Sequence, residues 1–330
     1  MTMLPGVIYT TEWFIIFRMY DVLLSFGLII AMGVGFRMLK VGGLEADSLR
    51  AAINISVFNI FLPALCIKII YTSAIDREAL LVPATAWITI LSGLFIALAV
   101  YALLEKILSI GQREKGVLLL AATFGNVAYL GLPVLTGLYG HEAAKYALYY
   151  DLLAATPLLW FVGAPLASRY GEGKRMGIGD SFRTIASLPP LWGIGAGFVL
   201  NLGGVALPSF LLKTLGMLGD LVVPLMIFTI GLALSLPKVR HAYAIIPAVT
   251  IKLGVVPFIS YVAAMVLGLE GTALASCFIE GAMPTMVLSL LIASRFKLDE
   301  SLAAFVIVVT TVLSFITLPL AMHFTHHLIR

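Results

Sequence analysis

The sequence predicts an all-α integral membrane protein of ten transmembrane helices, arranged as two inverted five-helix repeats with broken fourth and ninth helices. Composition, span count and the position of two interruptions lead to this prediction. The chain is 61% hydrophobic and only 12% charged, and its mean hydropathy is +1.06. A soluble domain carries roughly twice this charged fraction. Apolar stretches long enough to cross a bilayer recur along the chain, and two of them are interrupted by Gly and Pro at matching depths.

A window of about 20 residues, the length that crosses a bilayer as a helix, places the ten predicted spans. They cover about 15–36, 48–71, 79–104, 115–138, 143–167, 186–202, 208–236, 242–267, 271–293 and 302–325. The first is read as a retained helix, because no basic segment precedes it and no small-residue cleavage site follows it. The sixth is short and rich in Gly, and it is retained because the charge pattern requires it.

Basic residues gather on one side of this predicted topology. That side carries Arg37, Lys40, Arg50, Lys106, Arg113, Lys115, Arg169, Lys174, Arg175, Arg183, Lys238, Arg240, Arg295 and Lys297. The other side carries Arg77, Lys145 and Arg330. The positive-inside rule places the first side in the cytoplasm, so both termini are predicted outside, in a multi-pass protein of the cell inner (plasma) membrane. Topology accounts for the basic charge, and no nucleic-acid partner is expected.

A Gly-rich hydrophilic stretch divides the chain into a first repeat, residues 1–168, a cytoplasmic linker, 169–185, and a second repeat, 186–330. Because each repeat has an odd number of spans, the second must be inverted relative to the first. Asn59 precedes Pro63 by four residues in the second span, as Asp220 precedes Pro224 in the seventh. The broken fourth and ninth spans form the other matched pair, and such pairs indicate a carrier's binding site.

The two interruptions predict the charge of a ligand. The second halves of these spans are expected to begin near Pro133 and at Pro284, because proline suits a first helical turn. Both helix amino termini would then point into the membrane centre. Backbone amides near Tyr129 to Gly131 and at Ala282 to Met283 are expected to be exposed there, and such amides bind anions.

Polar residues at the predicted midplane are Asn59, Asn126, Asp220, Lys252 and Glu280. Ionised groups at this depth are costly, so each is a functional candidate that should face the protein interior. Lys252 either meets the substrate or forms an ion pair with Asp220 or Glu280. Glu280 either carries a proton or caps amides freed by the break. Asp220 either takes part in coupling or bonds backbone freed by Pro224, and Asn59 and Pro63 have supporting roles.

These stretches also resemble a known family, the auxin efflux carriers, which include the plant PIN-type exporters and bacterial relatives that handle malate or malonate. The resemblance rests on Asn126 to Pro133, Leu138-Tyr139-Gly140, Phe61 to Leu65, Asp220 to Leu232 and Met283-Pro284. It runs over essentially the whole chain and is most specific in the fourth and ninth spans.

The resemblance implies a fold similar to sodium/proton antiporters and bile-acid symporters. Spans 1, 2, 6 and 7 would form a scaffold domain, and spans 3–5 and 8–10 a transport domain. It implies substrate contacts at Asn126, Pro133 and Pro284, and it favours a homodimer. The chain departs from the plant pattern in its short linker and in Glu280, and an embedded acid suggests a coupling proton or sodium ion.

The sequence therefore predicts a secondary transporter of a small organic anion such as malate, malonate or an auxin-like acid. Tyr129, Gly131, Met283 and Lys252 complete the predicted binding site. Glu280 would couple a proton to the substrate through a shared electrostatic interaction. A sodium/proton exchanger or a sodium-coupled anion symporter is the alternative. The sequence has no paired intramembrane aspartates and no His-Glu-x-x-His motif, which argues against an enzyme, and no cofactor or metal is expected.

Overall fold

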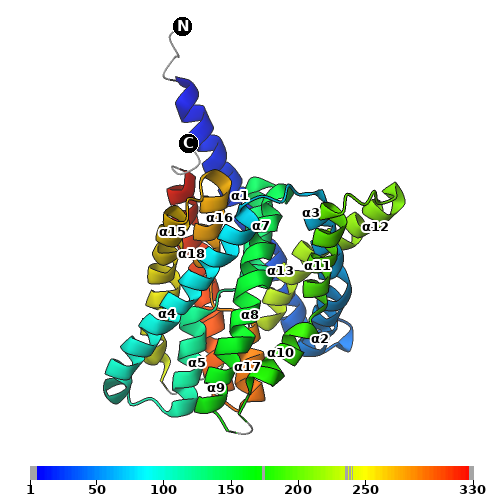
Figure 1. Cartoon of the computed structure of the whole chain (residues 1–330). Coiled ribbons are helices and arrows are strands. Elements are labelled where there is room, and N and C mark those ends of the chain that lie inside the picture. Colours follow the sequence, from blue (N-terminus) through cyan, green and yellow to red (C-terminus); the bar gives the residue numbers. More distant parts are fainter. Residues whose placement is uncertain (1–5, 173–174, 235–236, 238, 240, 327–330) are drawn as a thin grey trace.

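The computed structural model describes residues 6–172, 175–234, 237, 239 and 241–326. Of the basic residues used to predict topology, Lys174, Lys238, Arg240 and Arg330 lie outside this part of the chain. Every regular element of the described residues is helical. An isolated β-bridge joins Gly125 and Thr285. The helices pack side by side in one elongated bundle (Figure 1).

The helices of the first half are α1 (Gly6–Leu39), α2 (Ala46–Ser56), α3 (Leu62–Thr72), α4 (Glu78–Leu108), α5 (Gln112–Thr123), α6 (Leu132–Tyr139), α7 (Ala144–Tyr150), α8 (Thr156–Leu158) and α9 (Ala164–Tyr170). Those of the second half are α10 (Ile178–Ala186), α11 (Pro189–Leu202), α12 (Ser209–Gly219), α13 (Val222–Ala233), α14 (Ile245–Thr250), α15 (Val256–Val266), α16 (Gly271–Gly281), α17 (Leu288–Arg295) and α18 (Glu300–His326). Short 3₁₀ turns lie at Val41–Gly43 (η1), His141–Ala143 (η4) and Ala242–Ala244 (η7).

Five π-helical turns join these helices into longer ones. They are η2 (Val57–Phe61), η3 (Val127–Gly131), η5 (Asp151–Ala155), η6 (Leu159–Gly163) and η8 (Ile251–Val255). Each ends two residues before a proline: Pro63, Pro133, Pro157, Pro165 or Pro257. A proline ring clashes with the carbonyl group four residues earlier and cannot donate to it. The wider π turn moves that carbonyl away, so the helix continues through the proline instead of breaking.

Within the described residues, seven helical segments are long and apolar enough to cross a membrane: Asp21–Leu39, Ala46–Thr72, Glu78–Leu104, His141–Tyr170, Ser209–Ala233, Ala242–Val266 and Glu300–Phe324. An eighth is α10 with α11, which meet at a bend of 63°. The predicted fourth and ninth spans are too broken to pass this test, and in the fourth only the short apolar helix Val127–Tyr139 stands out. The protein is thus a multi-pass membrane protein by these spans.

The predicted linker, residues 169–185, contains a helix, because α10 occupies its second half. The helix begins after Gly177, whose N–H donates to Asp180 Oδ2 at 3.2 Å, while the Ser181 hydroxyl donates to the Gly177 carbonyl oxygen at 3.3 Å. Such local bonds satisfy groups that a helix start leaves unpaired. The predicted sixth span, 186–202, corresponds to the single helix α11, which meets α10 at the bend.

Glycines allow the backbones of neighbouring helices to approach closely. A Cβ on Gly33 of α1 would lie 2.9 Å from the Gly231 Cα of α13, and a Cβ on Gly193 of α11 would lie 2.9 Å from the Pro63 Cα of α3. Membrane helices associate through such small residues, because apolar side chains gain little by leaving lipid. Helices α1–α3 and α11–α13 therefore pack as one group, while α4, α5, α7, α14–α16 and α18 pack as another.

The start of α1 and the end of α18 lie at the same end of the bundle (Figure 1). The start of α5 and the ends of α9 and α17 lie at the opposite end of the bundle. The described basic residues predicted to share one side are largely carried by helix termini at that opposite end.

Candidate functional site

The two broken helices cross through their backbones. The chain is extended between α5 and η3 and again between α16 and α17. The Asn126 N–H donates to the Pro284 carbonyl oxygen at 2.7 Å, and the Met286 N–H donates to the Phe124 carbonyl oxygen at 2.9 Å. Backbone groups at this depth must be paired inside the protein, and here each break pairs groups of the other.

Thr285 fixes the crossing to two further helices. Its hydroxyl donates to the Ala121 carbonyl oxygen of α5 at 2.9 Å, and its N–H donates to Thr310 Oγ1 of α18 at 3.2 Å. Both threonine side chains are fully buried. The crossing is therefore a rigid junction of α5, α16, α17 and α18.

Lys252 lies beside this crossing and is 1% exposed. Its Nζ donates to the Gly281 carbonyl oxygen at 2.8 Å, at the end of α16. A Cβ on Gly125 would lie 3.2 Å from the lysine Cε and 3.3 Å from Nζ, so the ammonium group occupies the space that this glycine leaves free. The contact that the structure gives Lys252 is thus with a carbonyl oxygen, and not with the carboxylates considered from sequence.

Glu280 and Asn126 are buried at the crossing without hydrogen-bond partners. Both residues are 1% exposed, and neither the carboxyl oxygens nor the amide atoms have a partner within the described part of the chain. The Glu280 carboxyl group packs directly against Gly131, where a Cβ would lie 2.6 Å from its Cδ. An unpaired buried polar group costs about 1–3 kcal/mol. Such groups call for a ligand, an ion or water.

Ser276 is a further member of this site that the sequence reasoning missed. It lies one helical turn before Glu280 on α16, is fully buried, and its hydroxyl also lacks a partner among the described residues. Residues four apart share a helix face. The four-residue spacing could have identified Ser276 from the sequence, because it places the serine on the same helix face as Glu280.

The structure corrects three expectations about the breaks. Pro284 does not begin a helix, because the chain stays extended until Met286 to make the crossing, and α17 starts at Leu288. The amides of Gly131, Ala282 and Met283, which were expected to be exposed, donate within the chain instead. Gly131 N–H donates to the Asn126 carbonyl oxygen, and Met283 N–H to that of Glu280. The amide of Ala282 likewise donates within α16. Pro133 does lie in the first turn of α6, as expected.

Asn59 and Asp220 are not buried like Lys252, although Asn59 lines a cavity that extends to Tyr129. Both are exposed on the described surface. The Asn59 Nδ2 donates to the Ile55 carbonyl oxygen of its own helix at 2.7 Å, and Asp220 caps the end of α12. A polar side chain that bonds its own backbone does not require burial among other helices. Neither residue therefore joins Lys252 and Glu280.

A second buried acid, Asp151, lies in η5 and is 4% exposed. It accepts a hydrogen bond from the Thr156 hydroxyl at 3.3 Å. The η5 turn packs against η3, which contains Tyr129 and Gly131. Asp151 thus lies in the layer next to the crossing, with a partner on its own helix.

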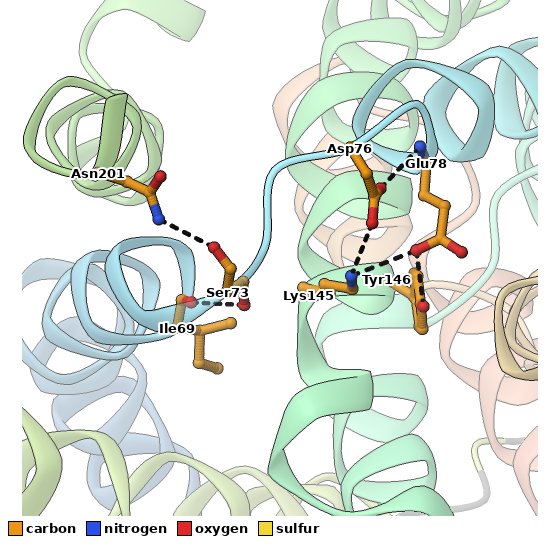
Figure 2. Close-up of polar contacts among 7 residues, drawn as sticks. All are labelled: Ile69, Ser73, Asp76, Glu78, Lys145, Tyr146 and Asn201. Carbon is orange, nitrogen blue, oxygen red and sulfur yellow. Dashed lines mark hydrogen bonds and ion pairs between the residues drawn. The ribbon is translucent and has the colours of Figure 1, made fainter. Parts of the chain in front are cut away.

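An ion cluster lies at the end of the bundle where α3 and α4 are joined. Lys145 Nζ is 3.6 Å from Asp76 Oδ2 and 3.2 Å from Glu78 Oε2, and Tyr146 donates to the same Glu78 oxygen at 2.8 Å (Figure 2). Figure 2 also shows Asn201 of α11 bonded to the loop that leads from α3 to these acids. This loop connects the two helix groups.

Comparisons with known proteins agree with the membrane architecture. A family model described as "Membrane transport protein", which represents auxin efflux carrier-like proteins, matches residues 24–177 and 178–322. A protein of Methanothermobacter thermautotrophicus described as an uncharacterized transporter is 29% identical over 290 residues, covering 86% of this chain and 91% of that protein. A protein of Methanocaldococcus jannaschii with the same description is 27% identical over 292 residues, covering 85% of this chain and 91% of its own length.

These matches cover nearly the whole chain and include both crossing segments, so the resemblance seen in the sequence is confirmed. They also favour a transporter over an enzyme. The chain belongs to the membrane transport protein family of auxin efflux carrier-like transporters.

Proposed function

We propose that the protein moves a small organic anion across the membrane by alternating access at the crossing of the two broken helices. One observation carries this proposal. Asn126 and Glu280 are buried without partners beside a buried lysine, Lys252, at a place where both helices are interrupted. A purely structural junction has no need for three costly polar groups at this depth.

An anion fits this set of groups. Lys252 supplies a cation at the crossing, and its hydrogen bond to the Gly281 carbonyl oxygen leaves ammonium protons for a further acceptor. The Asn126 Nδ2 is an unpaired donor. Tyr129 and Gly131 belong to η3, the first turn of the helix that continues through Pro133 into α6, and a helix start attracts negative charge. In this proposal Met283 and Pro284 complete the site from the second break.

The same proposal includes ten spans in two inverted repeats, with both termini outside the cytoplasm. Helices lie in each of the ten predicted stretches, as far as the structure describes them, and the two family matches meet near the middle of the chain. In this proposal the group α1–α3 with α11–α13 acts as the scaffold, and the remaining helices act as the transport domain. The loop between α3 and α4 is one of the connections between these domains, so rocking of one domain against the other would flex it.

We assign the coupling between proton binding and substrate binding to Glu280. Protonation of this carboxyl removes a negative charge beside Lys252 and Asn126, which makes the site more favourable to an anion. One proton and one substrate are then linked through a shared electrostatic interaction. The alternative is sodium coupling or sodium/proton exchange on the same fold. It is favoured by the unpaired oxygens of Glu280 and Asn126, because carboxylate and amide oxygens are the hard ligands that such a cation prefers.

The test is charge movement on a solid-supported membrane with protein in proteoliposomes. Malate, malonate, succinate, indole-3-acetate and sodium are applied in turn to wild type and Asn126→Ala. A current with one organic anion that disappears in the variant supports the proposal. A response to sodium alone replaces it with the cation-exchanger alternative.

The coupling role is tested with Glu280→Gln in the same assay, across a range of pH. Glu45→Gln is the matched control, because its carboxylate is exposed and only loosely paired with Lys40, 3.4 Å away. We expect the current to lose its pH dependence in Glu280→Gln alone. Transport as fast as wild type with an unchanged pH profile refutes the role of this residue.

A further inference from the structure

Helix α10 has an apolar face that no described part of the chain covers. Ile178 and Phe182 lie one helical turn apart on this face, and they are 80% and 66% exposed. The helix is held on an adjoining side, where Ser181 is fully buried, Ile185 is half-buried and α10 packs against η6. Two large apolar side chains beside each other on one exposed face call for apolar surroundings outside the protein.

The direction of α10 and a tryptophan beside it suit a membrane surface. The helix lies toward the end of the bundle opposite the chain termini, and it meets α11 at a bend of 63° (Figure 1). Because α11 runs with the bundle, α10 is inclined closer to the membrane plane than to the membrane normal. Trp192, near the start of α11, is 69% exposed, and its indole N–H donates to the Ala186 carbonyl oxygen at 2.8 Å. Tryptophan is enriched at the depth where lipid chains meet headgroups.

Three arginines surround the apolar face. Arg169 lies in the last turn of α9, Arg175 precedes α10, and Arg183 follows Phe182 within it. All three are exposed, and none forms an ion pair within the residues that the structure describes. Successive residues are roughly 100° apart around a helix, so Arg183 stands at the edge of the apolar face. From such an edge, a long arginine side chain carries its charge to the headgroups while its stem lies along the lipid.

Few acids compete for these cations. Asp180 accepts the Gly177 N–H at 3.2 Å at the start of α10, and Glu172 Oε1 lies 3.8 Å from Arg113, a further arginine. An excess of positive charge therefore remains around α10. An apolar helix face bordered by basic residues is the pattern of a helix that lies on a membrane of anionic lipids.

The segment around α10 is fixed to both helix groups. The Met176 N–H donates to the Ser168 hydroxyl oxygen of α9 at 3.1 Å, and both residues are buried. This bond holds the chain immediately after Arg175 against α9, which packs on α5 of one group. At its other end, α10 leads into α11 of the other group. A lipid bound to α10 thus contacts the connection between the two groups.

We propose that α10 is a membrane-surface anchor that binds anionic phospholipids of the leaflet at this end of the bundle. Ile178 and Phe182 lie among the acyl chains, and Arg175 and Arg183 bind the phosphate groups of the headgroups. Both contributions act on the same lipid molecules, because the apolar face and the arginines border each other. The anchor is independent of the crossing and of the transported substrate.

The first experiment measures the depth of α10 with a nitroxide spin label on Ile178→Cys, in the full-length protein reconstituted into bilayers. Asp180→Cys, on the polar side of the same helix, is the matched control. Both native cysteines are buried, so the label attaches to the introduced one. The label at residue 178 should be more accessible to oxygen, which concentrates in lipid, and the label at residue 180 to a water-soluble nickel chelate. A label at residue 178 that prefers the nickel chelate as the control does overturns the proposal.

The second experiment measures the unfolding temperature of the full-length protein in a neutral detergent as phosphatidylglycerol or phosphatidylcholine is added. A lipid that binds the folded protein raises this temperature. Phosphatidylglycerol should act at a lower concentration than phosphatidylcholine. Arg183→Gln should raise the phosphatidylglycerol concentration needed for half of the effect by about fivefold, and Arg175→Gln/Arg183→Gln by about 25-fold, because each basic residue near an anionic surface contributes about that factor.

Lys297→Gln is the matched control, because it removes one exposed charge at the same end of the bundle but outside α10. It should respond to phosphatidylglycerol as wild type does. Phe182→Ser keeps every charge, and it should weaken the phosphatidylglycerol effect and move the label at residue 178 toward water. If both lipids act equally on wild type, or the double arginine variant responds like wild type, α10 is not such an anchor. Neither measurement uses transport currents, so this inference and the transport proposal fail or stand separately.

Discussion

Replacing Gly131 by alanine introduces a methyl group into space that the Glu280 carboxyl group occupies. The new Cβ would lie 2.6 Å from Glu280 Cδ and 2.7 Å from Oε1, whereas ordinary contact begins at 3.4 Å. The carboxyl carbon must therefore retreat by at least about 0.8 Å, the difference between 3.4 and 2.6 Å, and Oε2, which the new Cβ would meet most closely, must move further. Because its surroundings are fully buried, the movement is resisted by packed neighbours.

Overpacking of this kind costs about 1–3 kcal/mol. Each kcal/mol shifts the unfolding temperature by roughly 2–4 °C in chains of 150–250 residues, and by less in larger ones. We expect Gly131→Ala to unfold about 2–8 °C below wild type. The assay is thermal unfolding of the purified protein in one detergent, followed by tryptophan fluorescence.

Gly195→Ala on α11 is the matched control, since a Cβ there meets nothing within 4 Å. It should be neutral or stabilise by about 0.4–1 kcal/mol, because alanine restricts the unfolded chain. Glu280→Asp shortens the acid and should rescue Gly131→Ala, giving a coupling of about 0.5–3 kcal/mol between the two sites. Wild-type stability of Gly131→Ala, or additive effects in the double variant, would refute the reasoning.

Two further predictions concern other buried contacts. Tyr101→Phe removes a hydroxyl that donates to the backbone of η7 at 2.9 Å and accepts from the Ala248 N–H at 3.0 Å. It should cost about 1–3 kcal/mol and accelerate hydrogen exchange at Ala248, and unchanged exchange there would contradict the assignment. Lys145→Gln leaves the acids of the α3–α4 loop unpaired, so the unfolding temperature should fall, and less so at high salt, where repulsion is screened. Exposed Lys213→Gln is the control, and a salt-independent loss would argue against repulsion between the acids.

Hydropathy predicted much of the fold, and the chemistry of neighbouring residues predicted the two breaks. Gly, Asn and Pro at 125–133 cannot continue an ordinary membrane helix, so an interruption there followed from backbone physics alone. The start of α6 at Pro133 followed for the same reason. Pro284 was misplaced because its conformation is set by a partner strand from the first half, which no local rule describes.

The side chains of the site were less accessible than its backbone. Hydropathy gives the depth of a residue but not the rotation of its helix. Asn59 and Asp220 were therefore grouped with Lys252, although they lie on the surface. Arg50 was used only for topology, because the cavity that it lines is bounded by α2, η6 and α17, which lie far apart in the sequence.

The crossing also constrains how the chain is made. The Asn126 N–H and the Phe124 carbonyl oxygen find their partners at Pro284 and Met286, which are synthesised long after them. Until the second half has been inserted, the first break holds unpaired backbone groups at a depth where lipid offers no substitute. Biosynthesis therefore ends with a docking step that joins early and late segments, and a chain truncated before Met286 lacks the partners that complete its centre.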